Sequence, residues 1–368
     1  MKRRGIALIL VLCVLFSLTG CGSSFERTTH TVTPHQEQSA SQEDGSILHA
    51  ENYANLVSCV QHFVLMGQYE GKVRIYKYSG DIEADLRSAC REVLTEDPLG
   101  AYALSDITYT YDRIVSYYEC TFHFVFRRTK QEISSIVNAY GDASIRKEIR
   151  SAMSTFRNNL TFRTSNYYAD QTNLYKLAQE AYYASPATAM GYPSIAISVY
   201  PDSGDVRIVE MQFSYDLSPD EMKQRADAAS AAAARILGQE TAADGNVAEL
   251  LCSRLLQSVT YDPDGGSSVY DALCLGSANS EAIALSYQLL CKQASIPCQV
   301  VQGTLNGVPH FWNIVEADGF HWHVDLTRGA PEQERLSTDY HMLSNGYYWS
   351  RDDFPRCDGA PDLISEAS

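Results

Sequence analysis

The chain has 368 residues and a formal net charge of −16, and 45% of its residues are hydrophobic and 11% aromatic. This apolar content is ample for packed cores, and the length suits two or three domains. Nucleic acid is disfavoured as a partner, because nucleic-acid binding rests on basic patches.

Residues 1–21 have the pattern of an export signal. The basic segment Lys2–Arg4 precedes an apolar run, Ile6–Leu18, which is too short to favour a membrane-spanning helix. The run ends in Leu-Thr-Gly-Cys at 18–21, which resembles the lipobox of bacterial lipoproteins. That resemblance implies cleavage before Cys21 and lipid on the new N-terminus, so the membrane is an expected partner and the extracytoplasmic face of the bacterial cell membrane the expected location. The alternative is an uncleaved anchor helix.

Residues 22–45 are rich in Ser, Thr, Gln, Glu and His and have almost no large apolar side chain. Such a segment cannot bury enough surface to fold, so it is predicted to be a disordered tether. The rest of the chain is predicted to have an α+β fold in three parts, with α+β repeats at 46–142 and 143–240 and a third domain at 241–368.

The two repeats are visible when the chain is aligned with itself at a shift of 88 to 89 residues. The positions that correspond in pattern are Leu86 with Leu174, Glu92 with Glu180, Pro98 with Pro186, Ile107 with Ile195, Tyr109 with Ile197, Phe122 with Met211, Phe124 with Phe213 and Phe126 with Tyr215. Both copies are therefore predicted to have one architecture, which suits a spacer or, through an open sheet edge, a recognition surface.

Each copy is predicted to contain a strand, a helix and a hairpin. The strands are expected at Val73–Tyr78 and Leu160–Arg163, and the helices at Asp81–Leu94 and Asp170–Tyr182. Thr129 with Glu132, and Ser218 with Glu221, have the spacing of capping boxes that start the helix after each hairpin.

The C-terminal part contains a series of spaced motifs. They are Tyr270–Leu273, Gly276, Ser280, Ile296-Pro297, Val300–Gly303, His310–Asn313 and Val324–Thr327. Over roughly residues 246–358 this series resembles the core of the transglutaminase-like superfamily, which implies a papain-like α+β domain. The family carries a nucleophilic cysteine four residues after the glycine and seventeen before the proline, at the start of a helix, and both counts fall on Ser280.

The resemblance assigns the other two members of the catalytic triad to His310 and Asp325, which are fifteen residues apart as in the family. It also makes Trp312 and Asn313 the expected substrate-binding residues. No cofactor is implied. No Cys-x-x-Cys pair or Cys-His cluster has zinc spacing, and the His321-x-His323 pattern is not interpreted as a metal site.

The sequence supports two main hypotheses. In the first, the domain is a pseudoenzyme that keeps the substrate groove of the family and binds a peptide or cell-wall-associated ligand. Activity is not expected in that case, because a site built around a thiolate rarely tolerates the change to an alcohol. In the second, Ser280, His310 and Asp325 form an acyl-transfer enzyme of the peptidase, amidase or transglutaminase type. A displaced nucleophile at Cys274, Cys291 or Cys298 is a third alternative. Cys90 and Cys120 are expected in a core, and a bridge between them is left open.

Overall fold

The computed structural model describes residues 47–238, 247–317, 319–327 and 347–349, all within one compact unit that spans 42–368. The fold is mixed α+β, as predicted. The expected signal, the tether and Cys21 lie outside the described residues. Within the described part of the chain, no helix is both long and apolar enough to cross a membrane.

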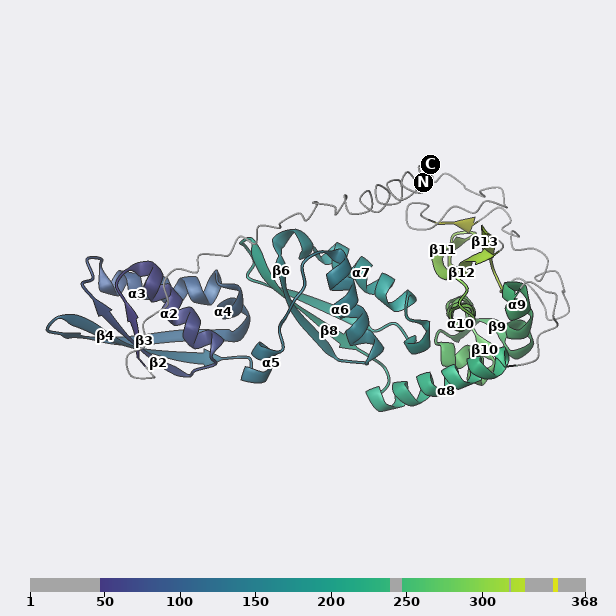
Figure 1. Cartoon of the computed structure of the whole chain (residues 1–368), viewed down its shortest axis with the longest axis horizontal. Coiled ribbons are helices and arrows are strands. Elements are labelled where there is room, and N and C mark those ends of the chain that lie inside the picture. Colours follow the sequence, from purple (N-terminus) through teal and green to yellow (C-terminus); the bar gives the residue numbers. More distant parts are fainter. Residues whose placement is uncertain (1–46, 239–246, 318, 328–346, 350–368) are drawn as a thin grey trace, which may run out of the picture. The chain divides into compact units, whose positions relative to one another are not determined.

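The first sheet has the strand order β1-β2-β4-β3, in which β1 and β2 are parallel and the other neighbours antiparallel. Figure 1 shows helices α2 and α3 against one face of this sheet. The elements are β1 (Ile47–Ala50), α2 (Tyr53–Leu65), β2 (Glu70–Tyr76), α3 (Ile82–Thr95), α4 (Pro98–Ala103), β3 (Leu104–Ile114) and β4 (Tyr117–Phe126).

The second sheet has the order β5-β6-β8-β7 and the same pattern of one parallel and two antiparallel neighbours. Its elements, with the short helix that leads into it, are α5 (Lys130–Ser134), β5 (Val137–Asn138), α6 (Asp142–Ser154), β6 (Asn159–Ser165), α7 (Gln171–Tyr183), β7 (Ser194–Tyr200) and β8 (Val206–Ser214). Strand β5 pairs with β6, so this sheet begins a few residues before the expected boundary at 142.

The strand, helix and hairpin expected for each copy occur in both the first and the second sheet regions. The aspartates before α3 and α7 explain where those helices begin. The Asp81 side chain accepts a hydrogen bond from the backbone N–H of Ala84, and Asp170 accepts one from Asn173. Each region also has an earlier strand and helix, β1–α2 and β5–α6, which the sequence patterns did not predict.

One predicted capping box is wrong in part. Thr129 and Glu132 exchange both bonds of a capping box at α5. Ser218 caps helix α8 (Pro219–Leu237), but the Glu221 carboxylate pairs with Arg225 at 2.8 Å instead of returning to the Ser218 backbone. A guanidinium one turn further along the helix is the stronger partner for an exposed carboxylate.

The C-terminal elements form a four-stranded antiparallel sheet, β13-β12-β11-β14, and a two-stranded parallel sheet, β10-β9, with helices beside them. They are α9 (Val247–Ser258), β9 (Thr260–Gly266), a π-helical turn (Asp271–Leu275), β10 (Ser277–Ala278), α10 (Ser280–Gln293), β11 (Cys298–Leu305), β12 (Val308–Ala317), β13 (Phe320–Val324) and β14 (Tyr347–Tyr348).

A single hydrophobic core joins the second sheet to the C-terminal elements, because its buried residues run from Ala139 to Leu326. Helix α10 lies within this core, and nearly every residue from Ser280 to Cys291 is buried. The segment that carries the predicted nucleophile position is therefore fixed by packing rather than exposed on a loop.

Candidate functional site

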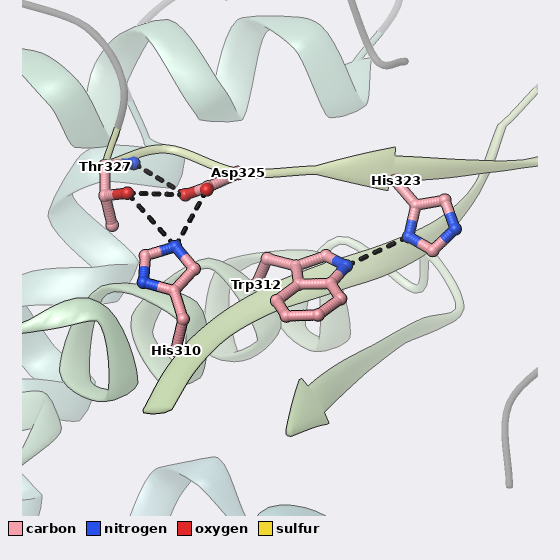
Figure 2. A network of polar contacts seen from close by, with 5 residues as sticks. All are labelled: His310, Trp312, His323, Asp325 and Thr327. Carbon is pink, nitrogen blue, oxygen red and sulfur yellow. Dashed lines mark hydrogen bonds and ion pairs between the residues drawn. The ribbon is translucent and has the colours of Figure 1, made fainter. Parts of the chain in front are cut away.

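His310 and Asp325, which the resemblance assigns to the triad, form a buried hydrogen-bonded pair. His310 lies on β12 and Asp325 directly follows β13, its antiparallel neighbour. The His310 Nε2 to Asp325 Oδ2 distance is 2.8 Å, and the two residues are 5% and 7% exposed. Figure 2 shows the Nδ1 side of the imidazole turned away from Asp325.

Thr327 completes the arrangement around the carboxylate. Its backbone N–H and its hydroxyl both donate to Asp325 Oδ1, at 2.9 and 2.8 Å, and its Oγ1 is 3.3 Å from His310 Nε2. Nε2 is therefore the ring nitrogen of His310 that faces the carboxylate, and Nδ1 lies on the other side of the ring (Figure 2).

Trp312 and His323 support the imidazole from within the sheet (Figure 2). The Trp312 ring stacks near His310 with a centroid separation of 6.2 Å, and its Nε1–H donates to His323 Nδ1 at 3.0 Å. Trp312 is 1% exposed and His323 is 4% exposed. His323 therefore acts here as a buried acceptor. Among the described residues, no group of three or more His, Cys, Asp or Glu is arranged to hold a metal ion.

Asn313 connects the sheet to helix α10. Its side-chain N–H groups donate to the Ala284 carbonyl at 3.0 Å and to the Gln299 carbonyl at 3.4 Å. Ala284 lies about one turn after Ser280. Asn313 thus holds the first part of α10 against the strand that carries His310.

Ser280 is the first residue of α10, as the sequence predicted. The Asn279 side chain caps the helix by accepting a hydrogen bond from Ala282 N, and Ser280 itself is 8% exposed. Four residues earlier, Gly276 has a φ of 77°, which glycine adopts without strain, and it ends the π-helical turn before α10. The hydroxyl therefore stands at a helix N-terminus, where the dipole favours negative charge.

Tyr183 and Glu281 form a contact that the sequence did not reveal. The Tyr183 hydroxyl donates to Glu281 Oε1 at 2.8 Å across a sequence separation of 98 residues. Burial raises the pKa of the Glu281 carboxyl, while the hydrogen bond from Tyr183 opposes that rise. The Tyr183 ring also packs against Phe311, with centroids 5.7 Å apart. Helix α7 of the second sheet thus contacts the residues next to both Ser280 and His310.

Cys274 and Cys298, two of the alternative nucleophiles, do not have the lowered pKa of an activated thiol. Burial raises the pKa of the Cys274 and Cys298 thiols, and it raises those of Cys59, Cys90 and Cys120 to about 12 each. Cys291 is buried on α10, about three turns from Ser280. All seven described cysteines are free, so Cys90 and Cys120 carry no bridge. A catalytic cysteine requires the opposite shift, toward a thiolate.

No family model and no curated protein matches the chain. The comparison with solved structures gives weak matches. A transglutaminase crystal structure is 12% identical with a TM-score of 0.27, over 56% of this chain and 61% of that one. A proposed cysteine protease from Cytophaga hutchinsonii is 14% identical with a TM-score of 0.24, over 37% and 62%. A proposed protease from Parabacteroides distasonis ATCC 8503 is 9% identical with a TM-score of 0.20, over 70% and 43%.

The matched regions thus cover less than two thirds of the length of each of these structures. TM-scores this low give no information about activity, so the function of the site is inferred from the residues of this chain.

Replacing Asp325 tests the buried pair. Asp325→Ala should lower the free energy of unfolding by about 1–3 kcal/mol, because the donors on His310 and Thr327 lose their buried acceptor. Asp325→Asn should cost less, since one carbonyl oxygen remains. Denaturant unfolding followed by tryptophan fluorescence measures both, with the exposed Asp112→Ala as control. Equal stability of Asp325→Ala and Asp112→Ala would contradict this role.

The Glu281 carboxyl should make stability depend on pH. Because the pKa of Glu281 is raised in the folded state, that state keeps a proton which the unfolded chain loses near pH ~4.3. Its contribution to stability should therefore fall as pH rises from about 4 through the raised folded pKa. The measured quantity is the free energy of unfolding of the natural chain minus that of Glu281→Gln, and it should decrease over this pH window. The same difference for Glu96→Gln, at an exposed glutamate, is the control. A difference that rises with pH would refute the assignment.

Proposed function

We propose that this protein is a lipid-anchored extracytoplasmic protein whose C-terminal transglutaminase-like domain binds a peptide or cell-wall-associated ligand without cysteine-type catalysis. The supporting observation is the buried His310–Asp325 pair at 2.8 Å, together with Ser280 rather than cysteine at the N-terminus of α10. A histidine–carboxylate pair supports the likeness to a triad, while the residue at the predicted nucleophile position is an alcohol and not a thiol.

The chemical reason is the acidity of the nucleophile. A helix N-terminus and a neighbouring imidazole can turn a thiol into a thiolate, because a thiol starts from a pKa of about 8.5. An alcohol is a much weaker acid and receives too little from the same dipole to ionise. It then depends on a general base and on oxyanion donors placed for oxygen rather than for the larger sulfur.

Trp312 and Asn313, predicted as substrate-binding residues, serve in this proposal to hold His310 and α10 in position. Both are 1% exposed, and the Trp312 Nε1–H and the Asn313 amide N–H groups bond to other parts of the protein. Their replacement would therefore act on a ligand through the positions of His310 and α10.

A serine acyl transferase is the alternative, and the orientation of the His310 ring favours it. With Nε2 facing Asp325, Nδ1 could accept the Ser280 hydroxyl proton as Oγ attacks an acyl carbonyl carbon. Collapse of the tetrahedral intermediate would expel the amine, which takes that proton, and a water or a second amine would then release the acyl group from Ser280.

The two earlier sheets, at Ile47–Phe126 and Val137–Ser214, are proposed to be copies of one unit, since they share strand order and orientation. The first copy suits a spacer between the membrane anchor and the C-terminal domain. The second copy has a further role, because Tyr183 of α7 contacts Glu281 and Phe311.

Binding without turnover is the expected behaviour of the full chain. Short peptides and purified peptidoglycan fragments should bind in a fluorescence polarisation or co-sedimentation assay, while mass spectrometry shows no cleavage and no amine incorporation. Turnover blocked by iodoacetamide would contradict the proposal. Turnover that survives alkylation but is lost in Ser280→Ala would establish the alternative, and the absence of any binding would refute the ligand-binding function.

Ser280→Cys should create a reactive thiol if His310 keeps catalytic geometry. The helix N-terminus and the imidazole would both lower its pKa, so alkylation near neutral pH should be faster than at any native cysteine. The enhancement should disappear in Ser280→Cys with His310→Ala, as read by peptide mapping. A rate equal to that of an ordinary exposed cysteine in both variants would mean that the pair has only a structural role.

Lipid on Cys21 should be visible in the mature protein. Mass spectrometry of the N-terminal peptide should find Cys21 as the first residue with acyl chains attached. An unmodified peptide that begins upstream of Cys21 would exclude the anchor, and Cys21→Ala, which should release the chain from the membrane fraction, provides an independent measurement.

A further inference from the structure

A groove of about 800 Å³ lies where helices α6 and α7 meet α10 and β11. Its walls differ in chemistry. The helices of the second sheet contribute Arg146, Arg150 and Lys176, and the C-terminal elements contribute three amide side chains, Gln288, Gln299 and Gln302. This volume is within the range of sites that hold small ligands.

The helical wall is positively charged in a strongly acidic protein. The described lining includes three cationic side chains and a single carboxylate, Glu180, while the chain as a whole has a net charge of −16. Arg146 pairs with Glu180 at 2.6 Å. Arg150 is exposed and forms no ion pair with another described residue. Such a local reversal of sign attracts an anionic group to this wall.

The opposite wall carries a buried acceptor. Gln288 is 7% exposed, and its Nε2 donates to the Cys298 carbonyl at 3.2 Å, which fixes the orientation of the amide. Its Oε1 accepts no hydrogen bond from the described residues. A buried acceptor without a donor is unfavourable, so a ligand N–H would be favoured at this position.

Tyr183 connects the groove to the candidate site. It lines the groove, donates to Glu281 and packs against Phe311. Glu281 follows Ser280 and Phe311 follows His310 in the sequence. A chain lying in the groove would therefore be next to the two elements, α10 and β12, that carry Ser280 and His310.

We propose that this groove binds a short acidic peptide, with its carboxylates on the Arg146 and Arg150 side and a backbone N–H donated to Gln288 Oε1. Cations on one wall and amides on the other match the two kinds of group that such a peptide presents along its length. This inference rests on the proposed peptide-binding function and specifies the ligand class for it.

The test is a binding comparison on the full chain in mild detergent, with a library of short fluorescein-labelled peptides graded in net charge from acidic to basic. Acidic peptides should bind most tightly. Arg150→Gln should weaken them about fivefold and Arg150→Glu further, because one partly exposed charge pair is lost and then reversed. The matched control is Arg157→Gln, which removes an exposed arginine from the segment after α6, outside the described lining of the groove.

A second pair of variants separates the groove from general surface charge. Gln288→Leu should weaken acidic and neutral peptides alike, because it removes the buried acceptor, whereas Arg150→Gln should affect acidic peptides alone. Peptides that bind without acidic preference, and equally to Arg150→Glu and Arg157→Gln, would overturn the inference and leave the peptide-binding function intact. Failure of every peptide to bind the natural chain would overturn both.

Discussion

The enclosure of helix α10 is the constraint on which the C-terminal part of the structure depends. Eleven of its fourteen residues are buried, so it needs apolar neighbours on every side. The Tyr287 hydroxyl reaches the Ala248 carbonyl of α9 at 3.1 Å, and Asn313 of β12 bonds to the Ala284 carbonyl. The core that encloses α10 continues into the second sheet. The position of Ser280 is therefore set by packing from several elements. Helix α10, which carries Ser280, and strand β12, which carries His310, are held to each other by Asn313.

This shared core changes the interpretation of the repeated units. A spacer would need little contact with the domain that it carries, but α7 forms one wall of the groove and bonds to Glu281. The first sheet lies outside this shared core, whose buried residues begin at Ala139, and it meets the second sheet through contacts such as the Arg128–Glu210 ion pair at 2.6 Å and the Tyr102–Tyr200 ring contact. Two sheets with the same strand order thus differ in what they pack against.

The sequence predicted well what local chemistry determines. The two helices expected from Asp81 and Asp170 begin there, with each aspartate as the cap. The resemblance assigned His310 and Asp325 to one site, and their side chains do meet, His310 on β12 and Asp325 directly after β13. The sequence did not predict Tyr183 with Glu281, because no local pattern relates residues 98 positions apart. It also missed β1 and β5, since strands of four and two residues are too short to show a period of two.

The buried histidine and aspartate do not by themselves indicate catalysis. In a buried site, removal of either partner deprives the other of a buried hydrogen bond, so both residues contribute to stability without any catalysis. Thr327 strengthens this effect, because two of its donors also depend on Asp325. Ser280 is under no such constraint from this network, since none of these hydrogen bonds uses its hydroxyl. A change of nucleophile could therefore leave the fold and the groove unaltered. Under the proposed function, recognition of a ligand by the walls around α10 would not require chemistry at the N-terminus of α10, because the two depend on different side chains.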